Sequence, residues 1–184
     1  TLRLMLPSVR PSVISRMPEA HDARKVHATG YVGPRKAILA VDDDLDHLGL
    51  LETLLKPMGF LIQCQPSPVT ALASLEDIAP DLFILDIDMP EMDGWSLAQR
   101  LRDDPKFRST PIMMVSAHAL EARSQVQREG LFDAFIIKRY SLEDLLLRIA
   151  ELLRVPLLHD APETDAPPAR TADRETFKKI RDLA

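Results

Sequence analysis

Residues 81–94, with the sequence DLFILDIDMPEMDG, place a short apolar run directly before a cluster of acidic side chains. The run Leu82 to Leu85 is typical of a buried β-strand. The stretch nevertheless carries five acidic side chains among its fourteen residues. A buried strand that leads straight into carboxylates indicates either an exposed loop or a site for a metal ion or a phosphoryl group, and the neighbouring segments decide between these two interpretations.

The same pattern, an apolar strand followed by a helix, recurs through residues 37–155. Fully apolar strands that alternate with helices predict an α/β fold, a doubly wound five-stranded parallel sheet with helices on both faces. We expect strands at 37–41, 60–64, 82–86, 111–117 and 134–138, and helices at 45–58, 68–79, 95–104, 119–130 and 142–155.

Composition limits the functions that this domain can have. The chain has 184 residues and a net charge of −5, but residues 37–155 hold eleven Lys or Arg against twenty Asp or Glu, a formal charge of −9. An acidic domain is poorly suited to contact a phosphate backbone, so we expect no direct binding of nucleic acid. The single cysteine, Cys64, allows no disulfide within the chain, which favours a cytoplasmic location. No apolar run reaches the about 18 residues that a membrane span needs, so we expect no membrane contact.

The two ends of the chain differ from the regular centre. Residues 1–35 contain three early prolines and little periodicity, and we expect them to form a disordered leader. Residues 36–155 form the predicted domain. Residues 156–184 begin as a linker rich in Pro and Ala and end in a predicted short helix that has Phe177, Ile180 and Leu183 on one side.

Side chains able to bind a cation and an anion follow the predicted strands. In doubly wound sheets, ligands bind beyond the carboxyl ends of the strands. Asp42 and Asp43 follow the first strand, Asp86 ends the third, Ser116 the fourth and Lys138 the fifth. If the first and third strands are neighbours about 4.8 Å apart, their carboxylates repel unless a cation or protons relieve them. Mg²⁺ suits such oxygens, and a hydroxyl with an ammonium suits a phosphoryl group.

Four segments, in this order, resemble the receiver domain of bacterial response regulators over about residues 36–155. They are ILAVDDD (38–44), DLFILDIDMPEMDG (81–94), PIMMVSA (111–117) and FIIKRY (135–140). The resemblance implies a flavodoxin-like sheet with the strand order 2-1-3-4-5. It also implies that the module is not an enzyme in the usual sense but a signalling domain controlled by phosphorylation.

The resemblance assigns a metal and phosphoryl role to four acidic positions. Asp86 matches the phosphoacceptor, which attacks phosphorus as a carboxylate and also contacts the metal. Asp42 and Asp43 match the acidic pair that holds Mg²⁺, Asp43 directly and Asp42 at least through water. Asp88 matches the position whose backbone carbonyl completes the metal shell.

Lys138, Ser116, Phe135 and His118, together with Asp88, match residues that contact or respond to the phosphoryl group in this family. Lys138 matches the lysine that pairs with the phosphoryl oxygens, Ser116 the switch hydroxyl, and Phe135 the aromatic residue whose rotamer follows that hydroxyl. Asp88 and His118 occupy the positions that tune how water reaches the acyl phosphate, although an exposed histidine without a role is an equally good interpretation of His118.

The resemblance also implies partners. The phosphoryl donor is a phosphohistidine of a sensor histidine kinase or of a histidine phosphotransfer protein. A homodimer through the face made by the fourth helix, the fifth strand and the fifth helix is a further hypothesis. Two alternatives stay open: a phosphohydrolase of the haloacid-dehalogenase type, whose Asp-x-Asp motif Asp86 and Asp88 would supply, and a receiver-like module that binds partners without phosphate. The first is disfavoured because that motif ends the first strand of its domain.

Two positions depart from the family pattern. Arg139 stands where proline usually follows the lysine, and Phe135 has no hydroxyl, although Tyr or His is frequent there. A cis bond before a residue other than proline costs roughly 3–4 kcal/mol, so we predict a trans bond between Lys138 and Arg139. We further expect Lys138 to reach Asp86 and Arg139 to project toward solvent or toward the fifth helix.

Overall fold

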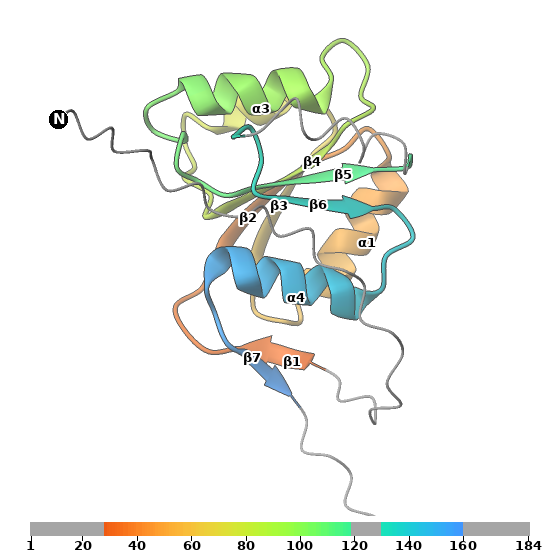
Figure 1. Cartoon of the computed structure of the whole chain (residues 1–184), viewed down its shortest axis with the longest axis vertical. Helices are drawn as coiled ribbons and strands as arrows, with labels where there is room; N and C mark the ends of the chain where they lie inside the picture. Colours follow the sequence, from red (N-terminus) through yellow and green to blue (C-terminus); the bar gives the residue numbers. More distant parts are fainter. Residues whose placement is uncertain (1–27, 119–129, 160–184) are drawn as a thin grey trace, which may run out of the picture.

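The computed structural model describes residues 28–118 and 130–159 (Figure 1). The predicted leader up to residue 27, the tail from residue 160 and most of the helix expected at 119–130 lie outside the described residues. The elements in chain order are β1 (Ala28–Tyr31), β2 (Ala37–Val41), α1 (Leu45–Leu55), β3 (Leu61–Gln65), α2 (Pro68–Ser74), β4 (Leu82–Asp86), α3 (Gly94–Asp103), β5 (Ile112–Ser116), β6 (Ala134–Ile137), α4 (Leu142–Leu153) and β7 (Leu157–His159).

The central sheet has the order β3-β2-β4-β5-β6, and all four of its strand pairs are parallel. Counted without β1, this is the predicted order 2-1-3-4-5, so the fold class is confirmed. The register places Val41 beside Leu85 and Asp86 beside Val115. The carboxyl ends of β2 and β4, at the centre of the sheet, therefore lie side by side.

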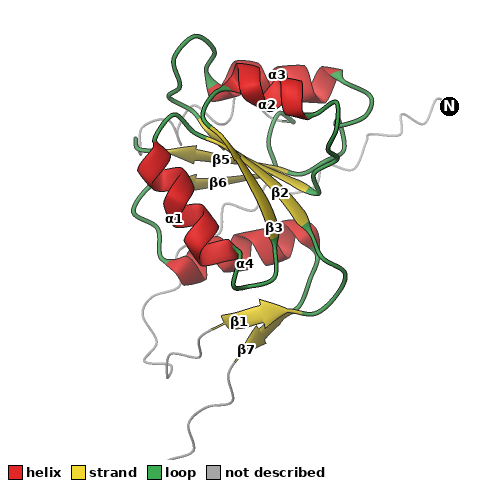
Figure 2. Cartoon of the chain, turned by 180° about the vertical axis from the view of Figure 1, so that it is seen from behind, coloured by secondary structure: helices red, strands yellow, loops and turns green. Residues whose placement is uncertain are grey.

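Alternation along each strand divides the core into two layers. Ile38 and Ala40 of β2 belong to a cluster that includes residues of α1 and α4, whereas Leu39 and Val41 belong to a cluster with residues of α2 and α3. Figure 2 shows this arrangement, with α2 and α3 on one face of the sheet and α1 and α4 on the other. Burial on both faces explains why the inner strands β2, β4 and β5 are mostly apolar, whereas the edge strand β3 (LIQCQ) has no buried residue.

Short polar side chains begin the helices by accepting backbone N–H groups. The N-caps are Asp44 for α1, Ser67 for α2, Asp93 for α3 and Ser141 for α4. All four described helices end before the expected residue, α3 and α4 by one or two residues and α1 and α2 by more. Helix α1 ends at Leu55 and α2 at Ser74, because the chain after each tightens into hydrogen bonds with the third residue back.

A two-stranded antiparallel ribbon, β1 with β7, joins residues on either side of the predicted domain, whose boundaries stay a prediction. Residues 28–31 were expected in the leader and 157–159 in the linker, yet Tyr31 pairs with Leu157. The ring of Tyr31 stacks on Phe60 with 4.4 Å between centroids, and its hydroxyl accepts the Lys36 N–H at 2.7 Å. Figure 1 shows the ribbon beyond α4, on the side away from the sheet. Within the described ranges, no helix has both the length and the apolar character that a membrane crossing requires.

Candidate functional site

Three carboxylates meet where β2 and β4 end. Asp42 and Asp43 follow β2, Asp86 is the last residue of β4, and one oxygen of each lies within 4.8 Å of the others. Asp42 and Asp86 are only 2% and 3% exposed, whereas Asp43 is exposed. Two buried carboxylates with a third at the solvent boundary form a hard, oxygen-rich donor set, which fits a partly hydrated Mg²⁺.

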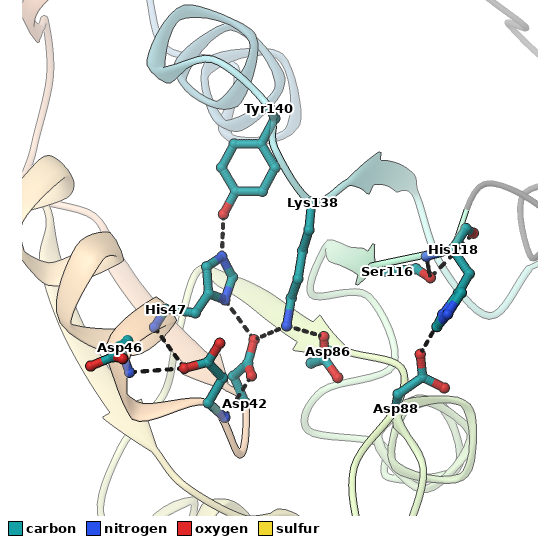
Figure 3. A network of polar contacts seen from close by, with 10 residues as sticks. Asp42, Asp46, His47, Asp86, Asp88, Ser116, His118, Lys138 and Tyr140 are labelled. Carbon is teal, nitrogen blue, oxygen red and sulfur yellow. Dashed lines mark hydrogen bonds and ion pairs between the residues drawn. The ribbon is translucent and has the colours of Figure 1, made fainter.

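The ammonium of Lys138 lies between the two buried carboxylates (Figure 3). Its Nζ is 2.7 Å from Asp86 Oδ1 and 3.0 Å from Asp42 Oδ2. The backbone N–H of Lys138 donates to the Ser116 carbonyl at 2.7 Å, which fixes the residue at the end of β6. The predicted reach of Lys138 to Asp86 is therefore confirmed.

The loop after Lys138 takes the path predicted from the missing proline. The bond from Lys138 to Arg139 is trans, and the Arg139 side chain is exposed. Arg139 has a φ of 77°, in the left-handed region that side chains other than Gly rarely adopt. Proline, with φ fixed near −65°, does not fit this conformation.

The two buried carboxylates that share Lys138 differ in the direction of their pKa shifts. Burial raises the pKa of Asp86 above its ordinary value and outweighs the hydrogen bond from Lys138, and the charge of Asp42 adds to the rise. Burial also acts to raise the pKa of Asp42, but hydrogen bonds from His47, the Asp44 backbone and Lys138 bring that pKa below its ordinary value. For Lys138, burial acts to lower the pKa, yet its hydrogen bonds to both carboxylates raise it.

Sequence reasoning missed two residues of this network, His47 and Tyr140. His47 Nδ1 is 2.6 Å from Asp42 Oδ2, and the other ring nitrogen makes a short hydrogen bond with the Tyr140 hydroxyl. Burial raises the pKa of Tyr140 to about 12, so the hydroxyl keeps its proton at neutral pH. The position of His47 in the first turn of the helix after Asp42 was the one signal that could have indicated it.

The predicted switch residues lie on β5 and β6, the two strands that follow β4 in the sheet. Ser116 is the last residue of β5 and fully buried, and its hydroxyl accepts the His118 N–H at 2.9 Å. Phe135 is half-buried on β6 and its ring lies 6.4 Å from the Phe132 ring. His118 Nδ1 is 3.3 Å from Asp88 Oδ2, and both side chains are exposed.

Gly94, the first residue of α3, lies against the backbone at the end of β4. Its N–H donates to the Ile87 carbonyl at 2.9 Å, and a Cβ on Gly94 would lie 2.1 Å from the carbonyl oxygen of Asp86. Only glycine therefore permits α3 to start this close to the residue that ends β4.

Comparison with known proteins agrees with this geometry. The family model for the response regulator receiver domain matches residues 38–150. The transcriptional regulatory protein PrrA of Mycobacterium tuberculosis is 34% identical over 126 residues, which cover 68% of this chain and 52% of PrrA. An uncharacterized 14.6 kDa protein of Leptolyngbya boryana is 37% identical over 101 residues, which cover 55% of this chain and 77% of that protein. Protein RcaC of Microchaete diplosiphon is 38% identical over 79 residues, 43% of this chain and 12% of RcaC. The chain thus spans about half of PrrA and a small part of RcaC.

Solved structures share the same architecture. A response regulator receiver domain protein from Methanospirillum hungatei is 28% identical, with a TM-score of 0.60, over 66% of this chain and 95% of that chain. The signal receiver domain of a histidine kinase from Syntrophus aciditrophicus is also 28% identical, with a TM-score of 0.60, over 65% of this chain and 90% of that chain. By the family model, these relatives and the fold, the chain belongs to the response regulator receiver domains.

Proposed function

We propose that this receiver domain accepts a phosphoryl group on Asp86 in the presence of Mg²⁺. The observation that carries the proposal is the approach of three carboxylates within 4.8 Å, two of them buried and bridged by the Lys138 ammonium. Receiver domains are signalling modules that generally bind Mg²⁺ at an acidic pocket. Here the carboxylates of Asp42, Asp43 and Asp86 and the backbone carbonyl of Asp88 would hold it.

In the proposed transfer, Asp86 is the only residue of the protein that forms a covalent bond. A bond forms between an Asp86 carboxylate oxygen and phosphorus, the phosphorus–nitrogen bond of the donor's phosphohistidine breaks, and the electron pair returns to the imidazole nitrogen. Lys138 would turn its ammonium toward the phosphoryl oxygens, a small movement because Nζ already lies 2.7 Å from Asp86. Bound Mg²⁺ would supply positive charge that offsets the charge on these oxygens.

The direct test is phosphorylation by a small donor. With acetyl phosphate and Mg²⁺, intact mass spectrometry should show one phosphoryl group, which Asp86→Asn and excess chelator should both abolish. Asp88→Asn is the matched control, because the exposed Asp88 would contribute only its backbone carbonyl to the metal, so the adduct should still form even if its lifetime changes. An adduct that survives in Asp86→Asn would contradict the proposal.

Ser116 and Phe135 are the proposed response elements. The Ser116 hydroxyl, now engaged with the His118 backbone, would turn toward the phosphoryl group, and Phe135 would move into the space beside it. Asp88 and His118, 3.3 Å apart at the pocket mouth, would control the access of water and so the lifetime of the acyl phosphate. Ser116→Ala should leave acceptance of the phosphoryl group intact but remove the phosphorylation-dependent chemical-shift changes in β6 and α4. If phosphorylation changes these shifts in the variant as much as in the wild type, Ser116 is not the switch.

The proposed donor is a sensor histidine kinase or a histidine phosphotransfer protein, in the cytoplasm. The homodimer stays a prediction, since residues 119–129 of that face lie outside the described ones; Ile137 and Leu147, 41% and 51% exposed, belong to its described part. Sedimentation with and without a phosphoryl mimic tests it: a mimic that leaves the mass unchanged at all concentrations excludes a phosphorylation-driven dimer.

The phosphohydrolase alternative is separable by turnover. A chromogenic phosphomonoester should release product no faster than the acyl phosphate on Asp86 is hydrolysed, because Asp86 must lose one phosphoryl group before it accepts another. Rapid multiple turnover that Asp88→Asn abolishes would favour the phosphohydrolase instead.

A further inference from the structure

The buried carboxylate of Asp42 is held by more donors than a simple metal ligand needs. Its Oδ1 accepts the Asp44 N–H at 2.9 Å, and its Oδ2 faces both Lys138 Nζ at 3.0 Å and His47 Nδ1 at 2.6 Å. The His47 side chain is 10% exposed, so its ring is held inside the network rather than free in solvent. Figure 3 shows the imidazole between Asp42 and Tyr140.

The partners of the ring define where its protons lie. Nδ1 faces a carboxylate oxygen, which only accepts, so Nδ1 carries a hydrogen whether or not the ring is charged. Nε2 faces the Tyr140 hydroxyl, which donates to the neutral ring. Tyr140 therefore supports the same tautomer that lets His47 donate to Asp42.

The pair also joins the segments that carry Asp42 and Lys138. His47 lies in the first turn of α1, immediately after the β2–α1 loop, and Tyr140 precedes Ser141, the N-cap of α4. The left-handed turn at Arg139 separates Lys138, which pairs with the carboxylates, from Tyr140, which contacts His47. The contact thus connects the acidic loop to the start of α4 across 93 positions in sequence.

We propose that His47 is a positioning residue, which holds the Asp42 carboxylate through Nδ1–H for Mg²⁺ binding, and that Tyr140 holds the imidazole in this tautomer. The inference rests on the proposed function, because the Asp42 carboxylate is set in place for that metal. Hydrogen bonds of this kind orient metal-binding carboxylates, and their loss typically lowers metal affinity by about 10–100-fold.

Two substitutions of His47 separate the donor from the ring. In His47→Asn, the amide N–H can occupy the place of Nδ1 and still donate to Asp42. In His47→Gln, the longer amide reaches the place of Nε2. It keeps the hydrogen bond with the Tyr140 hydroxyl but no longer donates to Asp42. Tyr140→Phe removes only the hydroxyl.

Calorimetric titration of the full chain with Mg²⁺ provides the readout. We expect His47→Asn to bind within a few-fold of wild type, His47→Gln to bind about 10-fold more weakly, and Tyr140→Phe to lie between them. Equal losses in the two His47 variants would show that ring packing matters rather than the donor, and wild-type affinity in all three would show that the pair has no positioning role; either result overturns the proposal.

If the wild-type chain binds no Mg²⁺, both the proposed function and this role are refuted. If the wild type binds Mg²⁺ and His47→Gln binds it equally well, only this role is refuted.

Nitrogen NMR of the metal-free protein tests the tautomer separately. We expect a hydrogen on Nδ1 of His47 and a shift of its ring signals in Tyr140→Phe; an Nδ1 without hydrogen would overturn the assignment.

Discussion

Replacement of Lys138 by Met tests how strongly the shared ammonium stabilises the fold. Methionine keeps an unbranched side chain of similar length but leaves Asp42 and Asp86 facing each other without a cation. Removal of one partner from a buried ion pair costs about 3–5 kcal/mol of unfolding free energy. Because the Lys138 side chain is 23% exposed and partly screened, we expect the lower end, about 3 kcal/mol, in the metal-free protein.

Lys36→Met is the matched control. Lys36 Nζ also pairs with a carboxylate, Asp81 Oδ1, at 2.9 Å, but the two side chains are 25% and 36% exposed. A pair at such a position contributes about 1 kcal/mol at most. The difference between the two variants therefore measures the effect of the buried carboxylates rather than of a missing lysine.

Urea denaturation with a chelator at several pH values measures both variants. The folded pKa of Lys138 is raised, so its contribution is fully present below the ordinary lysine pKa and is lost only as pH rises through the raised value. The cost of Lys138→Met should therefore be constant around neutral pH. It should shrink in acid, where protonation of Asp86, whose pKa burial raises, removes one of the two charges. Saturating Mg²⁺ should restore part of the loss. A cost no larger than that of Lys36→Met would refute this reasoning.

Substitutions at three further positions test the supporting structure by chemical denaturation. Gly94→Ala should lower the unfolding free energy by about 1–3 kcal/mol, because the new Cβ overlaps the Asp86 carbonyl oxygen; wild-type stability would mean that α3 can shift freely. Arg139→Gly should raise stability by up to about 1 kcal/mol by relieving the left-handed backbone, whereas Arg139→Pro should lower it by more than that, and the opposite ranking would contradict the loop path described here. Tyr31→Phe should cost about 1 kcal/mol, because the Lys36 N–H loses its acceptor; no cost would indicate that water replaces the hydroxyl.

The sequence was sufficient to predict the central sheet and the meeting of its acidic side chains. Strands buried on both faces appear as continuous apolar runs, and parallel strands bring their carboxyl ends to one edge. Asp42 and Asp86 could therefore be placed together without a structure. The trans bond before Arg139 was also predictable, since it follows from the energy of a local bond.

Contacts between distant segments were not predictable from local patterns. The strands β1 and β7 have four and three residues, too few to show a period, and they pair the two ends of the domain. The contact between His47 and Tyr140 has the same character, because neither residue carries a signal for the other. Even the end of α2 at Ser74 depends on how its last turn tightens, which residue propensity alone does not specify.

The acidic stretch 81–94 does not act as one negative patch, because its five carboxylates have different surroundings. Asp81 accepts the Lys36 ammonium and the Ala37 N–H at the start of β2, Asp93 caps α3, Asp88 faces His118, and Glu91 occupies a turn with a φ of 65°. Of these five, only Asp86 is buried. Desolvation raises the pKa of Asp86, which means that its ionised form is costly unless a positive charge lies beside it. Burial at the end of a central strand, rather than acidity itself, therefore distinguishes the proposed phosphoacceptor from its neighbours. The same burial makes its charge depend on Lys138 and on a bound cation.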